Sequence, residues 1–230
     1  VATIRALKMH GGVQKEDLKK ENTDLLKKGL PNLERHIQNI KKFGLEVVVA
    51  INHFITDTDD EIKILQEYCS KVGVKVSLCT HWSSGGTGTQ DLAKNVVEIC
   101  KMSKKENFKY LYSNEIPLKT KIETIAKEVY RAKGIDLDSK IDEQIKKIEQ
   151  AGFGKFPVCI AKTQYSFSTD PKLKGAPSDH TLSVREVRLS TGAKFIVVVC
   201  GAIMTMPGLP KVPAADSIKL NPKGEIEGLF

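Results

Sequence analysis

The chain has 230 residues, 40% hydrophobic and 28% charged, which is enough for one large domain or two smaller ones with a real core. It contains no apolar run long enough to cross a bilayer and opens without a signal-peptide pattern, so we expect no membrane partner. The net charge of +8 favours anionic partners such as nucleotides or polyglutamylated cofactors, although a solvated lysine-rich surface is the more ordinary explanation. Because no basic cluster is interleaved with aromatic residues, nucleic acid is not expected.

The cysteines are scattered, odd in number and include no C-x-x-C pair. A disulfide framework or a cysteine-rich zinc site is therefore not expected. Free thiols are typical of a reducing cytosol, which predicts a cytoplasmic protein. The residues are Cys69, Cys79, Cys100, Cys159 and Cys200.

The first residues, VATIRALKMHGG, carry neither an initiating methionine nor a recognisable helix cap. Val1 reads as the middle of an element rather than its start. We therefore expect the chain to be a fragment of a longer polypeptide.

The first predicted helix is amphipathic, and Gly44 stands where it would stop. Pro31 falls inside its pattern, so the helix either starts near this proline or bends there. Residues 47–51 are continuously apolar, which is typical of a strand buried on both faces. The apolar stripe of the helix consists of Leu26, Leu30, Leu33, Ile37 and Ile40.

Thr58-x-x-Glu61 has the form of a capping box and predicts the start of the next helix, and Gly73 marks its end. A short strand over residues 75–79 then leads through a glycine-rich turn into another amphipathic helix. This alternation predicts a parallel sheet with βαβ crossovers. The two apolar stripes consist of Ile62, Leu65, Cys69 and Val72, and of Leu92, Val96 and Ile99.

The pattern changes after about Met102. Residues 118–132 and 141–151 read as helices, the second capped by Ser139. Strands are predicted at three places: residues 158–161, the alternating LSVREVRL of residues 182–189, and the apolar FIVVVCGAI of residues 195–203. The alternation indicates an antiparallel strand with one solvated face, whereas the apolar run indicates a central strand.

Two units follow from this pattern. Residues 1–105 form an α/β part with a parallel-sheet βαβ segment, and residues 106–230 form a smaller α+β part.

Two large aromatic residues stand in consecutive strand-to-helix turns of the first part. Phe54 and Trp82 each follow the carboxyl end of a predicted strand, where ligands bind in open α/β sheets. Neighbouring strands lie about 4.8 Å apart, or about twice that with one strand between them, so the two rings can flank a flat heteroaromatic ligand. Stacking on one aromatic ring contributes about 1–3 kcal/mol per base. The alternative is that both rings fold inward and close the end of the sheet.

Weaker signals lie nearby. The turn SSGGTGT supplies Gly85, Gly86 and Gly88 ahead of a helix, which is a candidate anion site or simply a flexible turn. It is not a Walker A loop, because no lysine follows the glycines. Asn52 at a strand end, with Asp57 five residues on, weakly resembles the base-reading motif of P-loop proteins and is a candidate nucleotide contact.

Other kinds of site have less support. His53 and His81 each precede a turn aromatic, but two histidines without a third ligand do not predict a metal site. Neither a Ser-His-Asp order nor a cysteine–histidine dyad stands out.

Several longer motifs stand out: VATIRALKMHGG, VVVAINHFITDTDDE, the tryptophan–glycine turn, AKTQYSFS, REVRLSTGAKFIVVVCGAIMTMPGLPK and GEIEGLF. Together they resemble the carboxyl-terminal part of formate–tetrahydrofolate ligase (formyltetrahydrofolate synthetase). The resemblance covers essentially the whole chain and is nearest to the bacterial monofunctional form. The P-loop of the family, with its phosphate-binding lysine, has no counterpart here. The α/β part thus reads as a P-loop-type sheet without its N-terminal half.

The resemblance implies that ATP and formate give formyl phosphate, which the N10 amine of tetrahydrofolate attacks to give 10-formyltetrahydrofolate. It implies ATP with Mg²⁺ and a monovalent cation, a homo-oligomer, and catalytic groups in the missing N-terminal part. In the family a phenylalanine, a leucine and a tryptophan hold the folate ring, and they match Phe54, Leu78 and Trp82. His53 departs from the small residue expected there.

Two functional hypotheses follow. The first is the folate-binding portion of a ligase, which needs the P-loop part for chemistry and is inactive alone. The second is a stand-alone module that binds folate or a nucleotide without catalysis. A P-loop segment encoded upstream of Val1 would distinguish the first from the second.

Overall fold

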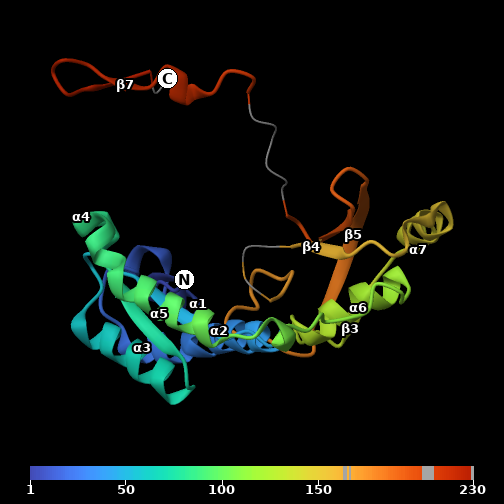
Figure 1. Ribbon diagram of the computed structural model, residues 1–230, viewed down its shortest axis with the longest axis horizontal. Coiled ribbons are helices and arrows are strands. Elements are labelled where there is room, and N and C mark those ends of the chain that lie inside the picture. The colour runs from blue at the N-terminus through green and yellow to red at the C-terminus, as the bar shows by residue number, and fades with distance from the viewer. Residues whose placement is uncertain (163–164, 166, 204–209, 229–230) are drawn as a thin grey trace.

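The computed structural model describes residues 1–162, 165, 167–203 and 210–228 (Figure 1). Motif residues at 163–164, 166, 204–209 and 229–230 lie outside the described residues. The elements of the first part, in chain order, are α1 (Ile4–Gly11), η1 (Lys15–Asp17), α2 (Thr23–Lys41), β1 (Val48–Asn52), α3 (Asp59–Lys71), β2 (Lys75–Cys79), α4 (His81–Ser84), η2 (Gly85–Thr89), α5 (Gln90–Met102) and η3 (Lys105–Asn107).

Strands β1 and β2 form a parallel pair in which Ile51 lies beside Leu78, and α3 connects them. The predicted βαβ unit is thereby confirmed. The start of the chain runs along the other edge of β1. There the N–H of Ala2 donates to the carbonyl of Ala50 (2.8 Å), and the N–H of Asn52 donates to the carbonyl of Ala2 (2.9 Å).

Helix α1 was not predicted, and the expectation that the opening residues lack a cap is wrong. The Thr3 hydroxyl accepts the N–H of Ala6 over 3.2 Å, and Gly12 ends the helix in the left-handed conformation. This helix packs so closely on α2 that a Cβ placed on Gly29 would lie 1.9 Å from the carbonyl oxygen of Leu7. Gly29 therefore permits the close approach of the two helices.

Helix α2 continues through Pro31 and therefore does not start near it. Its start is fixed by Asn22, whose side-chain oxygen accepts the N–H of Leu25 over 2.9 Å. The predicted capping box of α3 is confirmed, with Thr58 and Glu61 bonded reciprocally. The buried core of this part comprises Ala2, Ile4, Leu7, Leu26, Leu30, Leu33, Ile37, Val47, Val49, Ile51, Ile62, Leu65, Cys69 and Val74.

A fully buried ion pair joins α1 to α3. The Nζ of Lys8 lies 2.9 Å from Oε1 of Glu61, and neither side chain is exposed to solvent. Lys8 also donates to the carbonyl of Lys20 (2.8 Å), and the N–H of Asn22 donates to Glu61 (2.9 Å). The pair therefore fixes both helices and the segment that leads into α2.

The second part forms a mixed sheet in the order β3-β5-β6-β4. Its elements are α6 (Leu118–Glu128), β3 (Gly134–Asp136), α7 (Ser139–Ile148), the π-helical turn η4 (Glu149–Phe153), β4 (Val158–Ala161), β5 (Thr181–Ser190), β6 (Phe195–Cys200), η5 (Ala214–Asp216), β7 (Lys219–Leu220) and β8 (Ile226–Glu227).

Two predictions about this sheet are confirmed. Strand β5 pairs antiparallel with β6, and the apolar β6 is central, with β4 as its parallel neighbour on the other side. Strand β3 was not predicted, and it pairs parallel with β5 over three residues. The cap of α7 was placed one residue too late: the carboxylate of Asp138, not Ser139, accepts the N–H of Ile141 over 2.8 Å.

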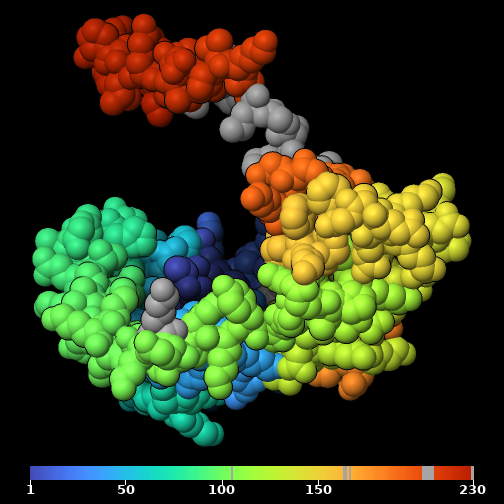
Figure 2. Space-filling model, turned by 45° about the vertical axis from the view of Figure 1, so that its right-hand side comes forward, coloured from blue at the N-terminus to red at the C-terminus, as the bar shows by residue number. Residues whose placement is uncertain are grey.

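Residues 210–228 lie apart from the rest of the molecule as a small hairpin of β7 and β8 (Figure 2). Within the described part of the chain, no helix combines the length and the apolar character needed to span a bilayer. The structure is thus α/β, with parallel strand pairs and one mixed sheet.

Candidate functional site

The candidate site is built on the carboxyl ends of β1 and β2. These strands pair directly, with Asn52 beside Cys79, and the N–H of His53 donates to the carbonyl of Cys79 over 3.1 Å. The loop that carries Phe54 and the helix α4 that carries Trp82 therefore follow the carboxyl ends of two adjacent strands, without a strand between them.

Phe54 is held by its backbone and is half-buried. Its N–H donates to Oδ2 of Asp57, and the N–H of Asp57 donates back to the carbonyl of Phe54, both over 2.9 Å. The Asp57 side chain is buried, and burial raises the pKa of its carboxyl group. This carboxylate thus shapes the loop, and its Oδ2 already accepts a backbone N–H.

One face of the Phe54 ring is covered by Arg5 of helix α1. The guanidinium carbon of Arg5 lies 4.1 Å from the ring centroid, and its Nη2 donates to Oγ1 of Thr56 over 3.1 Å. Sequence reasoning missed Arg5. The sequence offers one indication of its position: Thr3 is a good helix cap, and a helix capped there has Arg5 in its first turn.

The other two predicted folate residues are accessible. Trp82 on the short helix α4 is 57% exposed, and Leu78 on β2 is 36% exposed. Trp82 therefore does not fold into the core. Leu78 points to the same sheet face as its register partner Ile51, which is fully buried.

Asn52 belongs to a different face of the sheet from Leu78. Asn52 and Cys79 are register partners one residue beyond Ile51 and Leu78, and side chains alternate along a strand. A cavity of about 430 Å³ lies on that face, next to helix α5. Its walls include Asn52, His81 and Leu92 but none of Phe54, Leu78 and Trp82.

The glycine-rich turn forms η2 ahead of α5. The N–H of Gly85 donates to the carbonyl of His81, and the carbonyl of Gly88 accepts the N–H of Thr80 over 3.1 Å. A Cβ on Gly88 would lie 2.6 Å from the Thr80 carbonyl carbon, so this position requires glycine. Gly86 has open space around it.

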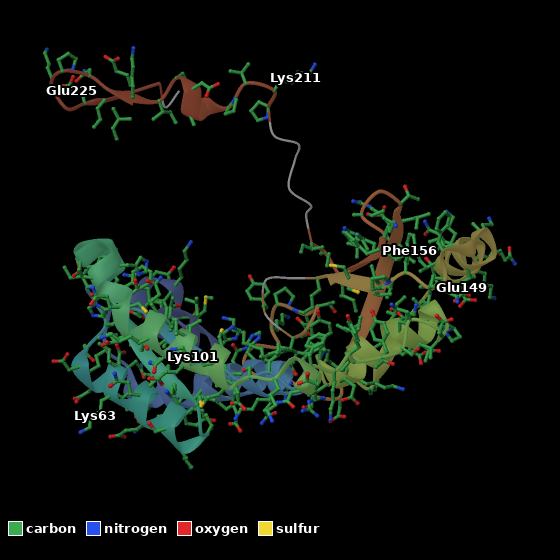
Figure 3. All side chains as sticks on the ribbon, viewed as in Figure 1. Lys63, Lys101, Glu149, Phe156, Lys211 and Glu225 are labelled. Carbon is green, nitrogen blue, oxygen red and sulfur yellow. The ribbon has the colours of Figure 1, made fainter. Side chains whose placement is uncertain are left out.

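The helices that connect and follow the two strands carry exposed lysine side chains. Lys63 on α3 and Lys101 on α5, both labelled in Figure 3, are exposed. Among the described residues, no group of three or more His, Cys, Asp or Glu side chains is placed to hold a metal ion. His53 and His81 belong to no such group.

The chain is similar to proteins of one family over its whole length. A family model described as formate–tetrahydrofolate ligase matches residues 1–230. Curated relatives of that name are 66% identical in Pelagibacter ubique, 56% in Roseobacter denitrificans and 56% in Ruegeria pomeroyi, each over 230 residues. Each match covers 100% of this chain but 41% of the relative, so the chain spans about two fifths of their length.

Proposed function

The chain belongs to the formate–tetrahydrofolate ligase family, and on that premise we propose that it is the folate-binding portion of an ATP-dependent ligase. In the proposed reaction, formate attacks the γ-phosphorus of ATP and gives formyl phosphate and ADP. The N10 amine of tetrahydrofolate then attacks the formyl carbon. The carbon–oxygen bond to phosphate breaks, and 10-formyltetrahydrofolate and phosphate leave.

The observation that carries this proposal is the placement of two aromatic residues at one sheet edge. Phe54 and Trp82 follow directly paired strands, and Trp82 keeps 57% of its surface exposed. A flat pterin ring stacked on such side chains gains about 1–3 kcal/mol from each ring by analogy with base stacking. Leu78, also accessible on β2, supplies an apolar edge. In this proposal these residues bind and orient the folate and keep water away from the acyl-transfer step.

Replacing Phe54 tests the proposal. In the full-length enzyme, Phe54→Ala should weaken tetrahydrofolate binding about tenfold to a hundredfold, because one stacking face is lost while the rest of the pocket remains. Trp82 is the only tryptophan of the chain, so saturable quenching of its fluorescence is a direct readout if the remaining part of the enzyme carries no other tryptophan. Otherwise, isothermal titration calorimetry gives the same affinity.

Trp82→Phe should cost less than Phe54→Ala, because a smaller ring still stacks. Circular dichroism must show that each variant is folded. Equal tetrahydrofolate affinity in the wild type and in a folded Phe54→Ala variant would mean that the ring only plugs the end of the sheet.

Chemistry on ATP is proposed to reside in a part of the polypeptide outside these 230 residues. The chain contains no G-x-x-x-x-G-K-[ST] motif, and its relatives are longer. We place Mg²⁺ on the ATP phosphates in that part, together with the monovalent cation, the P-loop and the catalytic groups. The α/β part, residues 1–105, would then complete a P-loop-type sheet. The boundary with residues 106–230 stays a prediction.

The edge of β1 opposite β2 is only partly paired, which supports such a completion. Ala2 pairs with only one position of this edge, and a groove of about 460 Å³ lies along it. The groove is lined by the start of the chain, α1, α2 and the β1 region. Its apolar residues include Val1, Leu33, Ile37, Ile40 and Val47, and its polar ones include Asn32 and His36. A strand added there would pair with the remaining backbone groups of β1. Helix α5 also exposes Val96 (44%) and Val97 (51%). In this proposal the rest of the enzyme, which is a cytoplasmic homo-oligomer, covers these two side chains.

Asn52 is the weaker candidate, for the adenine base of ATP. If its amide reads the base, Asn52→Ala in the full-length enzyme should raise the KM for ATP about twofold to tenfold, the worth of one hydrogen bond. The KM for tetrahydrofolate should change little, because Asn52 and Leu78 lie on opposite faces of the sheet. Equal increases in both constants would identify Asn52 as a structural turn residue.

A stand-alone binding module is the second candidate. It is favoured only by the lack of a Walker A motif in these residues. The glycines of η2 remain a weak anion candidate, since the Gly85 N–H already has a partner.

A further inference from the structure

The first turn of α1 lies beside the carboxyl end of β1. Ala2 pairs with Ile51 in the parallel direction, and the Thr3 cap starts the helix immediately afterwards. Arg5 therefore reaches the loop after β1, although two helices and a strand separate it from Phe54 in the chain. The next turn of the same helix carries Lys8, whose buried pair with Glu61 fixes the helix axis.

The contact between Arg5 and Phe54 is well defined. The guanidinium carbon lies 4.1 Å above the ring centroid, and Nη2 is anchored on the Thr56 hydroxyl at 3.1 Å. The Nε of Arg5 is buried without a hydrogen-bond partner among the described residues. A guanidinium that is partly withdrawn from water interacts more strongly with an aromatic face than an exposed one.

This stacking has two consequences for Phe54. The ring is held in one orientation, so a ligand that stacks on it loses less conformational freedom in the protein. One face is closed, so a flat ligand must use the other face. The cation also draws π-electron density toward its own side, which makes the free face a better partner for an electron-rich ring such as a reduced pterin.

We propose that Arg5 is a positioning residue for the folate substrate, acting through Phe54: it fixes the ring from behind and leaves its free face for the pterin. This inference rests on the proposed function. Arg5 touches Phe54 and Thr56 rather than the substrate. A purely structural role, in which Arg5 only ties α1 to the loop, is the competing explanation.

The test is a double-mutant cycle in the full-length enzyme, with tetrahydrofolate as the probe. Arg5→Met keeps an unbranched side chain over the ring but removes the charge and the planar group. It should raise the Kd and the KM for tetrahydrofolate about fivefold, with the KM for ATP unchanged. In a Phe54→Ala background, Arg5→Met should add no further loss, because the residue through which it acts is gone.

Two more variants separate positioning from structure. Arg5→Lys keeps the charge and should recover part of the affinity. Arg35→Met is the matched control, because Arg35 also stacks on an aromatic ring, 5.3 Å from the centroid of Phe167, far along helix α2. It should leave both KM values unchanged. Circular dichroism and urea unfolding must show that each variant is folded.

The outcomes are distinct. An equal loss of tetrahydrofolate affinity from Arg5→Met with and without Phe54, or parallel increases in both KM values, overturns the proposal in favour of a structural role. Unchanged affinity in Arg5→Met, when Phe54→Ala does weaken binding, also overturns it. If Phe54→Ala alone leaves the affinity unchanged, the proposed folate site at Phe54 is wrong. The proposed role of Arg5, which depends on that site, is then wrong as well.

Discussion

Lys8→Met is expected to destabilise the chain by about 3–5 kcal/mol, because it leaves the Glu61 carboxylate buried without its cation. Both side chains are fully buried, so water cannot replace the lost partner. The backbone N–H groups of Asn22 and Thr58 would still donate to Glu61, but they carry only partial charges. Urea unfolding followed by circular dichroism measures the loss directly.

The double variant Lys8→Met, Glu61→Gln provides the internal control. It removes both charges while the glutamine oxygen still accepts the N–H of Asn22, but the glutamine NH2 then faces the N–H of Thr58, so only part of the stability should return. Lys146 is exposed and pairs with the half-buried Asp142, which gives a second control, and Lys146→Met should have little effect. A Lys8→Met variant as stable as the wild type would show that the buried ion pair contributes no net stability.

Local sequence rules accounted for much of the fold. The capping box of Thr58 and Glu61 was found because its residue types and spacing suffice within one turn. The cap of α7 was missed by one residue because Asp138 and Ser139 are both good caps, and only the backbone chooses between them. Helix α1 was missed because Thr3 stands too near the start of the chain to show a periodic pattern.

The candidate site was predictable only in outline. The rule that ligands bind beyond the carboxyl ends of parallel strands placed Phe54 and Trp82 at one edge, and the direct pairing of β1 and β2 agrees. The rule cannot say which element covers each ring. Arg5 reaches Phe54 because Ala2 pairs with Ile51, and such long-range pairing leaves no trace in local spacing. Likewise, only the strand register places Asn52 and Leu78 on opposite faces.

The 230-residue chain alone is expected not to turn over ATP and formate. Formate-dependent ADP release should be at least about a thousandfold below that of the full-length enzyme, because the sequence has no Walker A lysine to meet the charge on the transferred phosphoryl group. The sequence has no lysine directly after its glycine-rich turn, and among the described residues no group of three or more His, Cys, Asp or Glu side chains is placed to hold a metal ion. A coupled ADP assay, with formate omitted as the blank, measures this rate.

Two additions make this result informative. The full-length enzyme supplies the positive control. Titration of the isolated chain with tetrahydrofolate shows separately whether the proposed folate site binds without the rest of the enzyme. If the remaining part of the enzyme, expressed separately, is mixed with the chain, ADP release should return, because the edge of β1 beside Ala2 is open to a further strand.

Formate-dependent release by the isolated chain well above the no-protein rate would contradict this assignment, because the phosphate site would then have to lie within these 230 residues. The cavity beside Asn52 and His81 would be the first place to look for it, since it opens at the carboxyl ends of β1 and β2, where α/β sheets bind nucleotides.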